Sequence, residues 1–316
     1  MAISTRITEM LGVAYPIVQA PMGWIARAQL ASAVSNAGGM GIIETSSGEL
    51  GAIREEIKKM RALTTKPFGV NIAQAFVRDP DIVSFVIDQG VNFVTTSAGD
   101  PQRYCAALKG AGLTVFHVVP SLKAALRAVD AGVDGLVVEG GEGGGFKNPR
   151  DVATMVLLPL VCETVGVPVI AAGGVVDGRS MAAAFALGAE GVQMGTRMVS
   201  AAESPVHDNW KHAILDAQET DTVFLNRFGP GPGLRALRTE RTTRLEKEPG
   251  ENIMGEFRSA LALYFRGDME ASIALSGQVA GRIHTVKPVA QIIAETMAEF
   301  ESTIASLGAR YASKQG

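Results

Sequence analysis

Residues 167–196 read VPVIAAGGVVDGRSMAAAFALGAEGVQMGT, and this stretch decides the fold class. A β-branched run, Val167–Gly174, is followed by Asp177, a residue type that caps helices, and by the helical pattern Arg179–Leu187. A second apolar run, Gly191–Thr196, comes next. A strand, a helix and a strand in this order form a βαβ unit, in which the two strands are parallel.

The same alternation recurs upstream. The other predicted strands are Pro16–Gln19, Met40–Glu44, Phe68–Ile72, Asn92–Ser97, Thr114–Val119 and Gly135–Gly140. Helical patterns between them include Glu49–Leu63, Asp81–Gln89 and Ser121–Ala131, the last with Ser121 at its N-cap. Eight regularly spaced strands in about 200 residues predict an α/β fold, a (β/α)8 TIM barrel. A flavodoxin-like open sheet is the alternative.

The strand–helix rhythm stops after the eighth strand. A final helical pattern, Pro288–Leu307, is long enough to be the eighth helix of the barrel. We therefore predict a barrel built from residues 1–204 and 286–316, with residues 205–285 as a mostly helical insertion or lid over one barrel mouth. The insertion contains the turn-rich stretch Phe228–Gly233 (FGPGPG), which we expect to be a bend or hinge.

The composition excludes several classes of protein. In the 316 residues, 47% are hydrophobic and 19% are charged, which argues against disorder. A net charge of −3 argues against a dedicated nucleic-acid binder. The N-terminal segment lacks an apolar signal core, and Pro159, Glu163 and Pro168 interrupt the most apolar stretch. We expect a cytoplasmic protein without membrane partners, with Cys105 and Cys162 reduced and buried in helices and a homodimer as an open alternative.

Small residues close the seventh and eighth strands. Gly173 and Gly174 follow one, and Gly195 and Thr196 follow the other. Active sites of TIM barrels form at these carboxyl ends, where glycine lets backbone N–H groups approach a phosphate and a threonine can donate its hydroxyl. The pattern predicts a phosphate site. The alternative is that the glycines only permit tight turns.

Other strand ends narrow the choice of ligand. Pro21, Met22 and Gly23 offer an apolar shelf, while Asn71 and Gln193 offer amides that donate and accept hydrogen bonds. Few charged residues mark these ends. A flat ring with heteroatoms at its edge, such as that of FMN, suits such walls better than a sugar phosphate does.

Four arginines follow the FGPGPG stretch at a spacing of three: Arg235, Arg238, Arg241 and Arg244. On a helix they would form one basic stripe. The stripe is either a solvated face or a patch for an anionic group, such as a CoA phosphate or an acidic carrier protein.

Six motifs point to one family: PIVQAPMG (16–23), GGMGIIE (38–44), FGVNI (68–72), TSAGDP (96–101), PVIAAGGVVDGR (168–179) and GAEGVQMGTR (188–197). Jointly they closely resemble the nitronate monooxygenase family, over about residues 5–215. The resemblance implies a TIM barrel that binds FMN non-covalently and an oxidoreductase activity. By position it implies flavin contacts at Pro21, Met22, Gly23 and Asn71, phosphate contacts at Gly173, Gly174, Gly195 and Thr196, and Gln193 close to the cofactor. Glu139, which ends the sixth strand, is a further candidate for cofactor binding.

The loop after the sixth strand departs from the family pattern. That pattern is roughly EGxE[AS]GGH, with the histidine beside the flavin, but residues 139–146 read EGGEGGGF. Phe146 therefore stands at the histidine position, where it can pack on flavin or on an apolar substrate but cannot transfer a proton. The remaining candidates for proton handling are Glu142, Lys147, Ser97 and Lys123, each with a structural alternative.

The histidines do not obviously replace the missing group. His117 lies within the fifth strand, as either a core residue or a site residue. His207 and His212 are five residues apart, so they do not share a helical face, and we predict no metal site.

The leading hypothesis is an FMN-dependent oxidoreductase that transfers hydride between NAD(P)H, FMN and a CoA- or carrier-linked enoyl or acyl thioester, or another bulky apolar substrate. Arg235, Arg238 and Arg241 would then bind the anionic portion of the substrate. The alternatives are a nitronate monooxygenase that oxidises alkyl nitronates with O2, a non-redox phosphate-binding barrel enzyme, and a flavin-binding regulatory protein.

Overall fold

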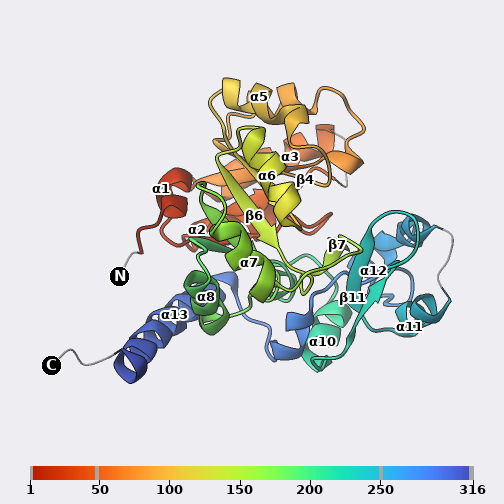
Figure 1. The fold of residues 1–316 in the computed structure, drawn as a ribbon. Helices are drawn as coiled ribbons and strands as arrows, with labels where there is room; N and C mark the ends of the chain where they lie inside the picture. Colours follow the sequence, from red (N-terminus) through yellow and green to blue (C-terminus); the bar gives the residue numbers. More distant parts are fainter. Residues whose placement is uncertain (1–2, 47–49, 249–251, 313–316) are drawn as a thin grey trace.

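The computed structural model describes residues 3–46, 50–248 and 252–312. Eight parallel strands form the barrel that the sequence predicts (Figure 1). They are β1 (Ile17–Gln19), β2 (Gly41–Ile43), β3 (Phe68–Ala73), β4 (Phe93–Ser97), β5 (Thr114–Val119), β6 (Gly135–Glu139), β8 (Val169–Ala172) and β9 (Gly191–Met194). Their order around the barrel is β1-β9-β8-β6-β5-β4-β3-β2, and a parallel bridge between Val18 and Met40 joins β1 to β2.

Helices surround the strands. They are α2 (Ala28–Asn36), α3 (Leu50–Leu63), α4 (Ile82–Asp88), α5 (Gln102–Gly110), α6 (Leu122–Asp130), α7 (Thr154–Cys162), α8 (Gly178–Ala186) and α13 (Val289–Tyr311). The predicted caps are confirmed, because the Ser121 side chain accepts a hydrogen bond from the Ala124 backbone and Asp177 accepts one from Ser180. The predicted start of α3 at Glu49 lies outside the described residues.

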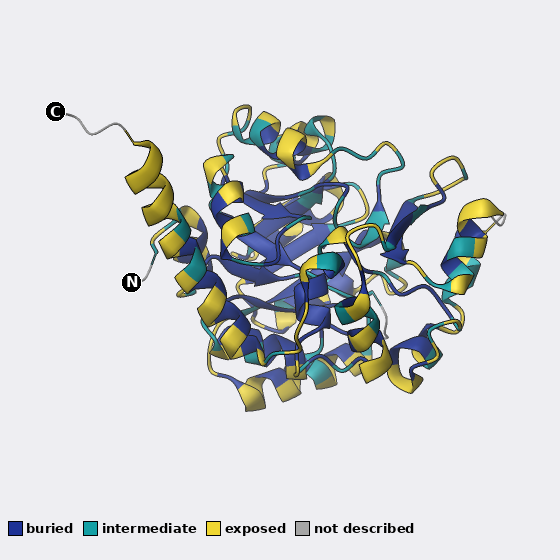
Figure 2. Ribbon diagram, turned by 90° about the horizontal axis from the view of Figure 1, so that it is seen from below, coloured by how far each residue is buried: buried dark blue, intermediate teal, exposed yellow. Residues whose placement is uncertain are grey.

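The last helix, α13, packs against α8. In α13 the Glu299 carboxylate accepts a hydrogen bond from Gly178 at 2.9 Å, and Phe300 meets Phe185 of α8 edge-on. The C-terminal part of α13 projects beyond the barrel with exposed side chains (Figure 2).

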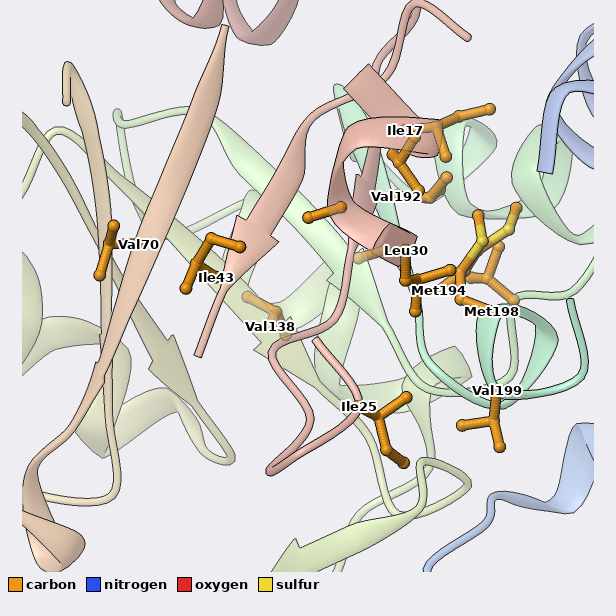
Figure 3. Packing of buried hydrophobic residues seen from close by; sticks show 14 of the residues in the cluster. Ile17, Ile25, Leu30, Ile43, Val70, Val138, Val192, Met194, Met198 and Val199 are labelled. Carbon is orange, nitrogen blue, oxygen red and sulfur yellow. The ribbon is translucent and has the colours of Figure 1, made fainter. Parts of the chain in front are cut away.

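Side chains alternate between two cores because successive strand residues face opposite sides of the sheet. Outward-facing residues such as Ile17, Val192 and Met194 pack with Leu30 of α2 in the larger core (Figure 3). Inward-facing residues such as Val18 share the smaller core with Ile7, Leu11, Ile42 and Val137, two of which come from α1 (Arg6–Leu11). This packing fills the interior of the barrel beneath the carboxyl ends of its strands.

Helices make up most of the regular secondary structure of the insertion, but it also contains a β-hairpin that the sequence analysis did not predict. Its helices are α10 (Asp208–Asp216), α11 (Glu240–Lys247), η2 (Ile253–Phe257), α12 (Ala260–Arg266) and η3 (Gln278–Arg282). The hairpin strands β10 (Thr222–Leu225) and β11 (Gly233–Leu237) form an antiparallel sheet with β7 (Gly145–Lys147), which comes from the loop after β6 (Figure 1). The stretch Phe228–Gly233 lies in the turn of this hairpin and ends at the first residue of β11; in the turn the Asn226 amide donates to the carbonyls of Pro230 and Pro232.

Arg235–Arg244 do not share one helix, so the basic stripe that these arginines would form on a helix is absent. Arg235 lies in β11, and α11 begins only at Glu240, after the capping box formed by Thr239 and Thr242. The backbone N–H and C=O groups of β11 form hydrogen bonds with β10 and β7. This pairing with other segments determines the local structure, whatever the spacing of the arginines.

A membrane span would need a long apolar helix. The described ranges contain no helix that combines the necessary length and hydropathy.

Candidate functional site

A cavity of about 650 Å³ lies at the carboxyl ends of the barrel strands. Residues from the strand ends form most of its wall, and Trp210, Pro232, Tyr264, Leu275 and Gly277 of the insertion complete it. The ten predicted cofactor residues all line this cavity: Pro21, Met22, Gly23, Asn71, Glu139, Gly173, Gly174, Gln193, Gly195 and Thr196. The proton-handling candidates Ser97, Lys123, Glu142 and Lys147 line it as well, as does Phe146. The structure therefore brings together predicted cofactor residues that are up to 175 positions apart, from Pro21 to Thr196.

The ends of β8 and β9 provide a cradle of backbone and hydroxyl groups. Gly173 and Gly174 have φ values of 85° and 79°, a left-handed conformation that side-chain-bearing residues rarely adopt. A Cβ atom on Gly174 would make van der Waals contact with the Glu142 carboxyl group at 3.9 Å, and one on Gly173 would come within 3.0 Å of the Gly140 carbonyl, so only glycine leaves this backbone uncovered. The Thr196 hydroxyl accepts a hydrogen bond from the Gly277 backbone at 2.8 Å, which leaves its proton available for an anion.

Amide groups occupy the wall beside this cradle. The Asn71 side chain donates to the Thr95 hydroxyl at 2.9 Å and approaches the Ser97 hydroxyl at 3.4 Å. Gln193 is buried, and its Oε1 has no hydrogen-bond partner within the described chain. Because a buried acceptor without a partner is costly, this atom is suited to a donor on a bound ligand, such as the edge of a flavin ring. The donor set and the glycine cradle thus fit FMN.

The charged residues of the loop after β6 form an ion pair and hydrogen bonds that fix the conformation of the loop. The Lys147 ammonium is buried and forms an ion pair with the Glu139 carboxylate. The Glu142 carboxylate accepts hydrogen bonds from the Thr154 backbone at 2.9 Å and from the Thr154 hydroxyl at 2.9 Å. Since Thr154 is the first residue of α7, Glu142 stabilises the N-terminus of that helix. Glu142 and Lys147 therefore both have partners within the protein. This arrangement favours the structural role that the sequence analysis gave as the alternative to proton handling.

Phe146 lies in β7, half-buried between the cavity and the insertion. Its ring lies 5.1 Å from the ring of Phe76 and 5.9 Å from that of Phe257. Phe76 follows β3 and also lines the cavity, whereas Phe257 belongs to η2. Phe146 thus forms part of an apolar wall of the cavity and connects the barrel to the insertion through its aromatic neighbours.

His117 belongs to both the core and the cavity wall. The ring lines the cavity, the residue is 4% exposed, and its Nδ1 lies 2.7 Å from the Thr96 hydroxyl. Burial lowers the pKa of His117 to about 4, although the charge of Asp100 and a hydrogen bond with Gly99 favour the charged form. The imidazole is therefore neutral near pH 7. The sequence analysis left two roles open for His117, a core residue or a site residue, and the structure gives it features of both.

The arginines of the expected stripe separate in the structure. Arg235 is buried, donates to the Gly141 carbonyl at 2.6 Å and lies 3.7 Å from Asp151; burial lowers the pKa of its guanidinium. Arg238 pairs with Glu246 at 2.9 Å, and Arg241 pairs with Glu256. None of these side chains lines the cavity wall among the described residues. Their predicted role in substrate binding has no support from this arrangement.

Two aromatic residues of the insertion were missed by sequence reasoning. Tyr264 is buried at the cavity, edge-on to Trp24 and 4.8 Å from the ring of Trp210, which also lines the cavity. Burial raises the pKa of Tyr264, so its hydroxyl stays protonated. Trp210 donates to Ser276 at 3.2 Å. Neither residue stands at a strand end or in a motif, so no sequence signal marked them.

Other reactive groups lie away from the cavity. Burial raises the pKa of Cys105 and raises that of Cys162 to about 11, so both thiols stay protonated near neutral pH. Cys162 is only partly buried, contrary to prediction. His207 accepts a hydrogen bond from the Asn209 backbone at the start of α10. Within the described ranges, no group of three His, Cys, Asp or Glu side chains could hold a metal ion.

Comparisons with known proteins agree with this geometry. The family model described as nitronate monooxygenase matches residues 4–82 and 73–299. A (3aS,4S,5R,7aS)-5-hydroxy-7a-methyl-1-oxo-octahydro-1H-indene-4-carboxyl-CoA dehydrogenase from Mycobacterium tuberculosis is 42% identical over 249 residues, which cover 78% of this chain and 69% of that protein. A probable nitronate monooxygenase from Staphylococcus saprophyticus is 32% identical over 72% of this chain and 76% of its own length. The solved structure of FabK from Thermotoga maritima has a TM-score of 0.91 and 40% identity, covering 97% of this chain and 99% of the other.

Proposed function

The chain belongs to the nitronate monooxygenase family of flavin-dependent oxidoreductases, and on this premise we propose that it binds FMN and acts on a thioester with a bulky apolar acyl group. Gly173, Gly174, Gly195 and Thr196 would hold the phosphate of FMN. Asn71 and Gln193 would hydrogen-bond the edge of the ring, and Met22 would pack beside it. When bound, FMN supplies hydride transfer, a step that needs no base from the protein.

The observation that carries the choice of substrate is the position of Phe146. Its ring lines the cavity against Phe76, at the place where the family pattern has a proton-transferring histidine. The titratable neighbours Glu142 and Lys147 are bound to Thr154 and Glu139. A site of this kind favours a reaction that removes no proton from carbon, such as hydride transfer to the β-carbon of an enoyl thioester with a solvent proton going to the α-carbon, over oxidation of a neutral nitroalkane, which needs a base.

The name of a similar protein supports this substrate class. The M. tuberculosis relative is named a carboxyl-CoA dehydrogenase with a fused-ring acyl group. A fused ring matches a wall built from Phe76, Phe146 and Leu275. NADH or NADPH is the proposed co-substrate. We also propose that residues 205–285 act as a lid, because Trp210, Tyr264 and Leu275 close one side of the cavity.

The test compares two substrates on the FMN-loaded protein. We expect turnover of a cyclic enoyl-CoA with NADH or NADPH, and slow oxidation of propyl nitronate by O2. Nitronate oxidation that exceeds thioester turnover would overturn the choice of substrate. A protein that stays colourless after addition of FMN would contradict the flavin itself and favour a non-redox phosphate-binding barrel.

The variant Phe146→His sharpens this test. We expect it to raise oxidation of the neutral parent compound, 1-nitropropane, relative to thioester turnover several-fold, because a histidine can remove the α proton there. The affinity for FMN, followed by flavin fluorescence, should change less than the ratio of the two activities. Phe257→His is the matched control, since Phe257 touches Phe146 but does not line the cavity. The cytoplasmic location and the homodimer stay predictions.

A further inference from the structure

Helix α6 presents two cations to the cavity that none of the roles above uses. Lys123 and Arg127 both line the cavity and are four residues apart, so they lie on the same face of the helix. Both are exposed. Arg127 forms an ion pair with Asp100, whose side chain is 40% exposed, at the same rim.

The other cation on the cavity wall is neutralised. Of the three Lys and Arg side chains that line the cavity in the described part of the chain, Lys147 is 3% exposed and paired with Glu139. Lys123 has no ion pair with any described residue. The charge of Asp100 is offset by Arg127, so the rim as a whole carries the positive charge of Lys123.

This rim is remote from the proposed phosphate cradle of FMN. Helix α6 follows β5, whereas the cradle follows β8 and β9, and the sheet order between them is β9-β8-β6-β5. Two steps between neighbouring strands separate β5 from β8 and three separate it from β9, which amounts to roughly 10–14 Å along the barrel. One cavity reaches both places, so it has room for a second anionic group while the first is held at the cradle.

We propose that Lys123 and Arg127 form a subsite for the diphosphate of an adenine nucleotide, and this inference rests on the proposed function. Lys123 supplies the net positive charge, and Arg127, one helical turn away, keeps N–H donors besides the one that Asp100 accepts, so the pair can hold two linked phosphates. The exposed rim leaves the nucleoside in solvent while the rest of the ligand enters the cavity. Two ligands of the proposed reaction carry such a diphosphate: the coenzyme A arm of a thioester, and the pyridine nucleotide. The subsite replaces the basic stripe expected at Arg235–Arg244, whose first three members bind within the protein instead.

The test is a calorimetric titration of the FMN-loaded protein with coenzyme A, with NADPH, and with pantetheine, which lacks the diphosphate. We expect Lys123→Ala to weaken binding of coenzyme A or NADPH about fivefold to tenfold, with pantetheine unchanged. Lys123→Arg should retain the affinity. Raising the salt concentration should weaken the wild-type complex more than the Lys123→Ala complex. Arg244→Ala is the matched control, because it removes an exposed cation outside the cavity.

Each outcome decides between the alternatives. A loss confined to coenzyme A assigns the subsite to the thioester, and a loss confined to NADPH assigns it to the co-substrate; both support the subsite. The subsite would be overturned if Lys123→Ala bound coenzyme A and NADPH as tightly as the wild type does. It would also be overturned if Arg244→Ala lost as much affinity as Lys123→Ala. Turnover of a pantetheine thioester separates this result from the proposed function: if it persists while Lys123→Ala binds normally, only the subsite fails. Absence of any thioester turnover by the FMN-loaded wild type would instead refute the proposed function.

Discussion

The barrel and the insertion build the same cavity by different means. In the barrel, neighbouring strands follow one another along the chain except where β9 pairs with β1 to close the ring, and the cavity residues stand where those strands end. In the insertion, the hairpin β10–β11 pairs with β7, and Arg235 binds Gly141, a residue 94 positions earlier. The difference teaches that local periodicity locates the site residues of a regular repeat, whereas an insertion takes its shape from distant partners.

The largest effect is expected from the barrel side. Gly174→Leu places a bulky side chain on the cavity wall at the cradle and should weaken FMN binding about hundredfold, measured by flavin fluorescence. Gly132→Leu is the control, because Gly132 has a similar φ of 86°, lies outside the cavity, and would place a Cβ atom with no neighbour within 4 Å. Equal losses of FMN in both variants would show that backbone strain, not the cradle, was responsible.

The next effect concerns the joint between the two regions. Arg235→Met leaves the buried Gly141 carbonyl without its donor and should lower the free energy of unfolding by about 2–3 kcal/mol in urea denaturation. Asp151 keeps its ion pair with Arg227. Arg238→Met, which removes a half-exposed pair, should cost only about 0.5 kcal/mol. If the two variants were equally stable, Arg235 would not be the link between β11 and the loop after β6.

A smaller effect tests the barrel wall through pH. The pKa of His117 is lowered from 6.5, the value of an unperturbed histidine, to about 4 in the folded protein, so the unfolded chain takes up a proton first as the pH falls. Between pH 7.5 and pH 5 this should cost about 2 kcal/mol of stability. His117→Gln should remove that part of the pH dependence, measured by urea denaturation at both pH values. The exposed His284→Gln should leave it unchanged, and the same slope in both variants would contradict burial of a neutral His117.

The smallest effect is expected at the edge of the insertion. Phe228 is 96% exposed in the hairpin turn, so Phe228→Ser should change the stability by less than about 0.5 kcal/mol and leave turnover unaltered. Thermal unfolding and steady-state kinetics check both expectations. A clear change in kcat would instead indicate that this stretch acts as a hinge, as its glycines and prolines suggested.

Much of the barrel could be predicted because its signals are local. The caps Ser121 and Asp177 start their helices within a few residues of the strands they follow. The glycines after β8 and β9 reach the cavity because parallel strands place their carboxyl ends at one edge. The hairpin escaped prediction because its third strand is β7, part of a loop whose glycines carry no strand signal.

Sequence alone determined the eight-strand period, the residues at the strand ends and the substitution of Phe146 for the family histidine. Tertiary structure alone decided what surrounds that residue: Phe76 from one barrel loop, Phe257 from the insertion, and carboxylates already bound elsewhere. It also decided which cations face the cavity. The spacing of the arginines pointed to Arg235 as a residue that binds an anionic substrate, but in the folded protein Lys123 lines the cavity and Arg235 does not. The physical reason is that a repeat is specified by contacts within one unit, whereas burial and pairing depend on segments that only the folded chain brings together.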